Sequence, residues 1–130
     1  MHYGNFTIYA QNAEAKGEKR LAKRIRIEGR ICAALVDALL AKGCAVSVND
    51  GEEWTVKRST DKGTIIGALF TTDEDRIVAR DAEGTLLGQW YLVYGNDGYD
   101  VISDYSANDF AEAIWEELRP VIDKAEEEMA

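Results

Sequence analysis

Carboxylates and turn-forming residues are concentrated in residues 93–105, which read V-Y-G-N-D-G-Y-D-V-I-S-D-Y. Two chemistries could use such a stretch, namely calcium binding by an acidic loop and acid–base catalysis by a carboxylate pair. A calcium loop needs alternating oxygen ligands before its glycine and a bidentate glutamate at its twelfth position. Neither of the two Asn-Asp-Gly triplets, at 49–51 and 96–98, meets this requirement. Both triplets instead predict tight hairpin turns, because these residue types tolerate a positive φ.

The sequence also contains few residues at the spacing that a catalytic site requires. If Asp100 and Asp104 lie on one strand, they are about 13 Å apart, which is too far for a glycosidase pair. The single histidine, His2, has no cysteine or histidine at a spacing suited to zinc. Without a second histidine, a serine or cysteine triad lacks its base unless His2 folds back. No phosphate-binding glycine motif is present. We therefore expect a non-enzymatic protein without catalytic residues, metal or cofactor, and we keep a small enzyme of unknown class as a third hypothesis.

The net charge of −9 is unevenly distributed along the chain. Residues 16–30 contain seven basic side chains, whereas residues 95–130 contain eleven acidic side chains and only two basic ones. The basic segment could line a nucleic-acid surface. However, nucleic-acid binders usually combine a basic domain with interleaved aromatic residues. Here the sequence pI is about 4.6 and no aromatic residue lies between Tyr9 and Trp54. We therefore expect no direct nucleic-acid binding, and a charged edge strand is the simpler interpretation.

The acidic C-terminal third supports two interpretations. It could be a solvated helix face that aids solubility. Alternatively, its carboxylates could mimic the regular row of charges along a nucleic-acid backbone and occupy a basic groove on another protein. The candidate partner-binding residues are Asp97, Asp100, Asp104, Asp109, Glu112, Glu116, Asp123 and Glu127. Trp115 or the aromatic strand at 86–94 could anchor such a contact.

The chain length predicts one domain, residues 1–130. The patterns predict an α+β fold in the order ββαββαβββα, with a mainly antiparallel sheet and about three packed helices. The expected strands are 6–10, 21–28, 45–49, 53–59, 76–80, 86–94 and 99–105, and the expected helices are 31–41, a short one within 59–72, and 107–129.

Three expectations concern individual elements. The helix at 31–41 is apolar nearly all round, so it is either buried on more than one side or forms a subunit interface, which would make a homodimer. The strand at 86–94 has apolar residues on both faces and should be central. In the last helix, Ser106 could be the N-cap with Asp109 in a capping-box position, and Pro120 should cause a kink or a break.

Three features of the sequence bear on the cellular compartment of the protein. No apolar run is long enough to span a bilayer, and the first ten residues do not resemble a signal peptide. Cys32 and Cys44 match small buried hydrophobic positions and should be reduced. We therefore expect a cytoplasmic protein.

Several motifs resemble a group of small uncharacterised proteins of tailed phages and prophages. They are V-Y-G-N-D-G-Y-D-V-I-S-D-Y, V-N-D-G-E-E-W-T-V-K-R-S-T-D, L-F-T-T-D-E-D and R-I-R-I-E-G-R-I-C, and together they cover about residues 20–106. The resemblance implies a phage accessory protein in a bacterial cytoplasm and no catalytic residue. Small acidic proteins of this kind often block host machinery, including restriction and CRISPR complexes. The leading hypothesis is thus a non-enzymatic inhibitor of a host nucleic-acid-handling or defence complex, and the alternative is a structural or scaffolding homodimer built on helix 31–41.

Overall fold

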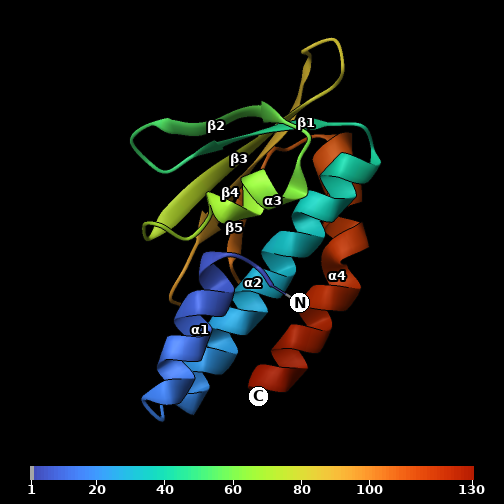
Figure 1. Cartoon of the computed structure of the whole chain (residues 1–130). Helices are drawn as coiled ribbons and strands as arrows, with labels where there is room; N and C mark the ends of the chain where they lie inside the picture. The colour runs from blue at the N-terminus through green and yellow to red at the C-terminus, as the bar shows by residue number, and fades with distance from the viewer. Residues whose placement is uncertain (1) are drawn as a thin grey trace.

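The computed structural model describes residues 2–130 and has the element order ααββαβββα (Figure 1). The elements are α1 (Asn5–Ala15), α2 (Lys19–Ala41), β1 (Ala45–Asn49), β2 (Trp54–Ser59), α3 (Lys62–Gly67), β3 (Glu74–Arg80), β4 (Leu86–Val93), β5 (Ile102–Tyr105) and α4 (Asp109–Met129). The five strands form one antiparallel sheet in the order β2-β1-β3-β4-β5. The predicted α+β class and antiparallel sheet are therefore confirmed, while the predicted element order and number of helices differ from the structure.

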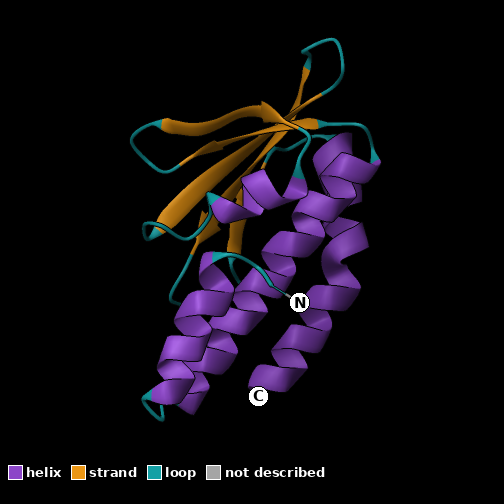
Figure 2. Cartoon of the chain, in the orientation of Figure 1, coloured by secondary structure: helices purple, strands orange, loops and turns teal. Residues whose placement is uncertain are grey.

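All four helices lie on one side of the sheet (Figure 2). Helix α2 is central, because it packs against α1, α3, α4 and β1. The core between the layers is built from fully buried side chains such as Ile31, Leu35, Ile77, Trp90 and Ile114. Within residues 2–130, no helix covers the opposite face of the sheet (Figure 2).

The predicted strand at 6–10 is wrong, since these residues lie in α1. Phe6, Ala10 and Ala13 are buried at helical spacing, whereas Ile8 and Tyr9 remain about half exposed. Phe6 is fully buried and stacks on Phe70, with 5.0 Å between ring centroids. Packing of this face onto α2 therefore overrides the strand propensity of the aromatic and β-branched residues.

The predicted strand at 21–28 is also wrong, because α2 is continuous through this segment. Buried side chains recur with a spacing of three and four residues, at Ala22, Ile25, Gly29, Cys32, Val36 and Leu39. This is the apolar stripe of a helix that packs on both α1 and the sheet. The predicted helix at 31–41 is confirmed as the second half of α2.

The predictions from residue 45 to residue 105 agree well with the structure. The β1–β2 hairpin, α3, β3 and β4 are present, whereas the triplet at 96–98 lies in the loop 94–101 and not in a tight hairpin turn, and β5 begins at Ile102 instead of residue 99. Gly51 and Gly98, which end the two Asn-Asp-Gly triplets, have φ values of 104° and 93° and so supply the conformation that a β-carbon disfavours. Strand β4 is internal to the sheet as expected, since it pairs with β3 and β5.

The last helix differs from expectation at its start, and of the two outcomes predicted at Pro120, a kink or a break, the break does not occur. Asn108, not Ser106, is the N-cap, and its side-chain oxygen accepts a hydrogen bond from the Ala111 N–H at 2.8 Å. Ser106 instead accepts a bond from the Gln89 N–H and ties this segment to β4. Pro120 does not break the helix, because α4 continues through it to Met129.

No helix within residues 2–130 combines the length and the hydrophobicity needed to cross a membrane. Cys32 and Cys44 are both free and buried. Burial raises the pKa of both thiols, well above the usual value for Cys32, so neither is a reactive thiolate near neutral pH.

Candidate interaction surface

The predicted carboxylates of α4 share the solvent side of one helix. Asp109, Glu112, Glu116, Asp123 and Glu127 are all exposed, while Ile114, Leu118, Ile122 and Ala125 on the other side are buried. At 3.6 residues per turn these five positions lie within a narrow sector of the helix. We call these five residues the α4 acidic stripe.

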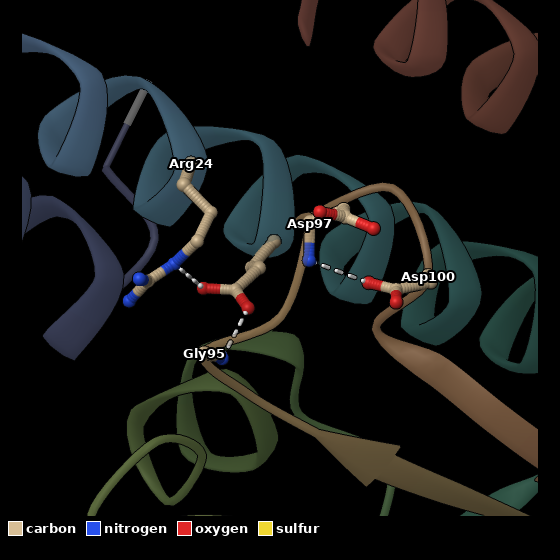
Figure 3. A network of polar contacts seen from close by, with 5 residues as sticks. Arg24, Gly95, Asp97 and Asp100 are labelled. Carbon is tan, nitrogen blue, oxygen red and sulfur yellow. Dashed lines mark hydrogen bonds and ion pairs between the residues drawn. The ribbon is translucent and has the colours of Figure 1, made fainter.

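The three remaining predicted carboxylates precede α4. Asp97 is exposed in the loop between β4 and β5. Asp100 is half-buried in the same loop, and its Oδ1 accepts a hydrogen bond from the Asp97 N–H at 3.1 Å (Figure 3). Asp104 lies on β5 and is exposed. Asp100 is therefore in a loop and not on the strand, which removes the sequence argument that placed it about 13 Å from Asp104 on one strand face.

Two tyrosines show that this segment and α4 form one electrostatic environment. Burial raises the pKa of Tyr105, and the nearby carboxylates Glu112, Glu116 and Asp104 raise it further. On the same segment, Asp97, Glu126 and Asp100 raise the pKa of Tyr99. Negative charge from the β4–β5 loop, β5 and both halves of α4 therefore converges on these two tyrosines.

Tyr105 also fixes the position of α4 against β5. Its ring stacks on Trp115, with 5.2 Å between centroids and 20° between ring planes. Its hydroxyl donates a long hydrogen bond of 3.4 Å to Glu112. Trp115 is half-buried and packs against the core, so only part of its ring is available to a partner.

The basic residues of the chain neutralise other carboxylates. Two α4 carboxylates outside the predicted set form ion pairs. Glu117 pairs with Lys42, which follows α2, and Glu128 pairs with Arg30 of α2. Among the ion pairs of residues 2–130, one includes a carboxylate of the predicted set. It joins Glu116 to Arg119 at 3.6 Å. The α4 acidic stripe and the neighbouring aspartates thus keep most of their negative charge facing solvent.

The basic segment 16–30 forms part of a helical surface instead of the predicted edge strand. Arg26 is paired with Glu14 of α1, and Arg30 with Glu128 of α4. Arg20 donates a hydrogen bond to the Met129 carbonyl oxygen. Much of this positive charge is therefore used to join α2 to its neighbouring helices.

Glu28 is a buried carboxylate that sequence analysis did not single out. It is fully buried in α2, and its Oε2 accepts a hydrogen bond from the Gly95 N–H at 2.9 Å (Figure 3). Its Oε1 lies 3.5 Å from Nε of Arg24, which is an ion-pair distance without hydrogen-bond geometry. Burial raises the pKa of Glu28, more strongly than Gly95 and Arg24 lower it. This contact holds the start of the loop that carries Asp97 and Asp100.

Asp75 is a second buried carboxylate and lies at the start of β3. Its Oδ2 accepts hydrogen bonds from the Tyr94 hydroxyl at 2.5 Å and from the Phe70 N–H at 2.9 Å. Burial raises the pKa of Asp75 to about 6. Phe70 has a φ of 61°, so this hydrogen bond stabilises a backbone conformation that bulky residues rarely adopt. These contacts indicate a structural role for Asp75.

The described residues bring together no group of three or more histidine, cysteine, aspartate or glutamate side chains suited to hold a metal ion. His2 accepts a hydrogen bond from the Gly4 N–H through Nδ1. The apolar side chains of segment 31–41 that would form a dimer interface, such as Ile31, Leu35 and Leu39, are fully buried within the chain's own core. On this segment Ala34, Ala38 and Leu40 are partly exposed.

The chain was compared with protein-family models, with curated proteins and with solved structures, and none of the three comparisons gives a match.

Proposed function

We propose that this protein is a non-enzymatic binding protein that inhibits a nucleic-acid-handling or defence complex by occupying a Lys- and Arg-lined groove on it. The α4 acidic stripe and the neighbouring Asp97, Asp100 and Asp104 form the binding surface. In this proposal the protein is an accessory protein of phage type that acts in a bacterial cytoplasm.

A single observation carries the proposal. The carboxylates of this surface remain largely unpaired, while basic residues of α2 and its C-cap form ion pairs with Glu14, Glu117 and Glu128. An acidic surface that is left free in this way presents a strong negative potential to solvent. Such a potential accelerates association with a basic partner and repels nucleic acid.

The rigid support of the surface adds to the argument. The Tyr105–Trp115 stack, the Ser106 bond to β4 and the Glu28 bond to Gly95 hold the loop, β5 and α4 in fixed relation. A surface that is already ordered loses little conformational entropy on binding. This favours a binding role over a purely solubilising one, for which no fixed geometry is needed.

The test is a pull-down from a bacterial lysate with the tagged protein at low and at high salt. We expect captured proteins that dissociate as the salt concentration rises, because screening weakens contacts between exposed charges. In the triple variant Glu112→Lys, Glu116→Lys and Asp123→Lys, we expect these proteins to be lost.

The matched control changes the net charge by the same amount elsewhere. Glu18, Glu53 and Glu83 are exposed and lie outside the surface, so their replacement by lysine should retain the captured proteins. Equal capture by the surface variant and the wild type would refute the proposal. Equal loss in both triple variants would show that only net charge matters and would also refute it.

A further inference from the structure

The face of the sheet opposite the helices carries one row of side chains that crosses all five strands. Register places Trp54 of β2 beside Asn49 of β1, and Asn49 beside Arg76 of β3. Arg76 is in turn paired with Tyr91 of β4, and Tyr91 with Asp104 of β5. Paired residues in an antiparallel sheet point to the same face. The row therefore reads Trp-Asn-Arg-Tyr-Asp, and we call it the cross-strand row.

The cross-strand row has the composition of an interface centre. Trp54 is 40% exposed and Tyr91 is 42% exposed, although their neighbours Val48, Trp90 and Leu92 on the helix side are completely buried. The Arg76 guanidinium lies 5.1 Å from the centroid of the Trp54 ring. Tryptophan, tyrosine and arginine are the residues most enriched among binding hot spots. The cation–π contacts of residues 2–130 do not include Tyr91, so the face of its ring is available to a cation from a partner.

Beside the row, the surface is hollowed. A depression of about 640 Å³ is lined by Asn49, Arg76, Tyr91 and Asp104 of the row and by Glu52 and Glu74 at its margin. Three of these six residues are exposed carboxylates, and the one cation, Arg76, is directed to Trp54. None of the three carboxylates takes part in an ion pair within residues 2–130. The depression therefore has an aromatic wall and an excess of negative charge.

We infer that this depression is a docking site for a lysine- or arginine-bearing segment of a partner protein. The cationic group would lie over the Tyr91 ring and donate charge-assisted hydrogen bonds to the carboxylates of Glu52, Glu74 and Asp104. The Trp54 ring, held by Arg76, would cover the aliphatic part of the segment. This inference rests on the proposed function in one respect, since it takes the same class of basic partner, and it adds a second contact region that meets the acidic surface at Asp104.

Charge selects this occupant over a single-stranded nucleic acid. Exposed aromatic rings on a sheet are also suited to stacking nucleic-acid bases. However, a backbone of phosphates would pass over Glu52, Glu74 and Asp104, and the chain has a net charge of −9. A basic peptide gains from the same charges that would repel phosphates.

The test is an amide chemical-shift titration of the isotope-labelled full chain with a capped Gly-Arg-Gly-Arg-Gly peptide. The corresponding glutamate peptide and an oligothymidine are the comparison ligands. We expect shifts at Asn49, Arg76 and Tyr91 with the arginine peptide and not with the other two. The Tyr91→Ala variant should weaken binding at these amides by about three- to tenfold, which is the range expected for the loss of one cation–π contact.

Leu86→Ala is the matched control, because Leu86 is a similarly exposed residue, 47% accessible, at the start of the same strand. It should leave the affinity unchanged, and Glu74→Gln should reduce it without removing any buried group. The inference is overturned if the sheet amides do not shift, if oligothymidine shifts them equally, or if Tyr91→Ala binds as tightly as the wild type. Shifts on the α4 acidic stripe are scored separately, so failure at the sheet and failure of the proposed function are distinguishable.

Discussion

Asp75 gives the protein a stability that should depend on pH in a defined direction. The residue is only 3% exposed, and burial raises the pKa of its carboxyl group from the usual 3.8 to about 6. A carboxyl whose pKa is raised by folding stabilises the folded state fully while it is protonated, below about pH 4. This contribution is lost as the pH rises through about 6, because the unfolded chain ionises more readily. A change of this size corresponds to about 3 kcal/mol.

We therefore expect Asp75→Asn to become more stable relative to the wild type as the pH is raised from 4 to 7, by about 3 kcal/mol. The asparagine carbonyl can still accept the bonds from Phe70 and Tyr94, so the comparison isolates the charge. Urea unfolding at several pH values measures the difference. Asp73→Asn, an exposed neighbour, should run parallel to the wild type. If Asp75→Asn also runs parallel to the wild type, folding does not raise the pKa of Asp75.

Neither Asp75 nor Glu28 could be recognised from the sequence as buried. Asp75 lies in the polar run T-T-D-E-D-R, and Glu28 lies in a basic segment, so each looks like a surface residue. What buries them is contact with residues far along the chain, Tyr94 for Asp75 and Gly95 for Glu28. The exposed carboxylates of the last helix were easier to predict, because their exposure follows from the helical period alone.

At the level of elements, the crossing of α1 and α2 depends on one glycine. A β-carbon added at Gly29 would lie 2.7 Å from Cβ and 2.9 Å from Cγ of Phe6, which is fully buried. We expect Gly29→Ala to force the helices apart and to lower the free energy of unfolding by about 1 to 3 kcal/mol, as for overpacked cores. Thermal or chemical denaturation measures this loss.

Gly67→Ala provides the matched control for Gly29→Ala. Gly67 is also helical and has a negative φ, but a β-carbon there would meet no atom within 4 Å. Its replacement should be neutral or should stabilise the protein by up to about 1 kcal/mol, because alanine is the better helix former. A Gly29→Ala variant as stable as Gly67→Ala would show that the two helices are not in tight contact at this point.

The elements that sequence patterns predicted correctly are those with strong local signals. The Asn-Asp-Gly triplet at 49–51 marks the β1–β2 hairpin, and the alternation in β3 and β4 is long enough to be unambiguous. The predictions for the first 28 residues were wrong because they rested on patterns in short segments of sequence. Ile25 and Ile27 alternate with arginines over too few residues to distinguish a strand from a helix, and only the longer repeat from Ala22 to Leu39 identifies α2.

At the level of the whole molecule, the protein has two acidic surfaces, one on each layer, and they adjoin at β5. The α4 acidic stripe lies on the helical layer, and the cross-strand row lies on the open face of the sheet. Asp104 belongs to the sheet row and also contributes to the field at Tyr105 beside α4. A basic partner that reached around the β5 edge could contact both surfaces without any rearrangement of the protein.

The distribution of charge along α4 allows a test of whether the carboxylates serve the helix or something outside it. Asp109 and Glu112 lie in the first turn, where the helix dipole favours negative charge. Asp123 and Glu127 lie four residues apart in the C-terminal half, and the last turn contains no basic residue. Like charges at this spacing and at this end of a helix are unfavourable. The second pair therefore gains no stability from the helix dipole or from its spacing.

We expect Asp123→Asn with Glu127→Gln to raise the free energy of unfolding by about 0.5 kcal/mol at low salt, and Asp109→Asn with Glu112→Gln to lower it by a similar amount. The two double variants carry the same change in net charge, so opposite signs cannot arise from net charge. Urea unfolding at low and high salt measures both effects, and the difference should shrink at high salt because exposed charges are screened. If both double variants shift stability in the same direction, net charge alone governs the effect. The carboxylates at the end of α4 would then be explained by solubility, and their retention would no longer support a binding surface.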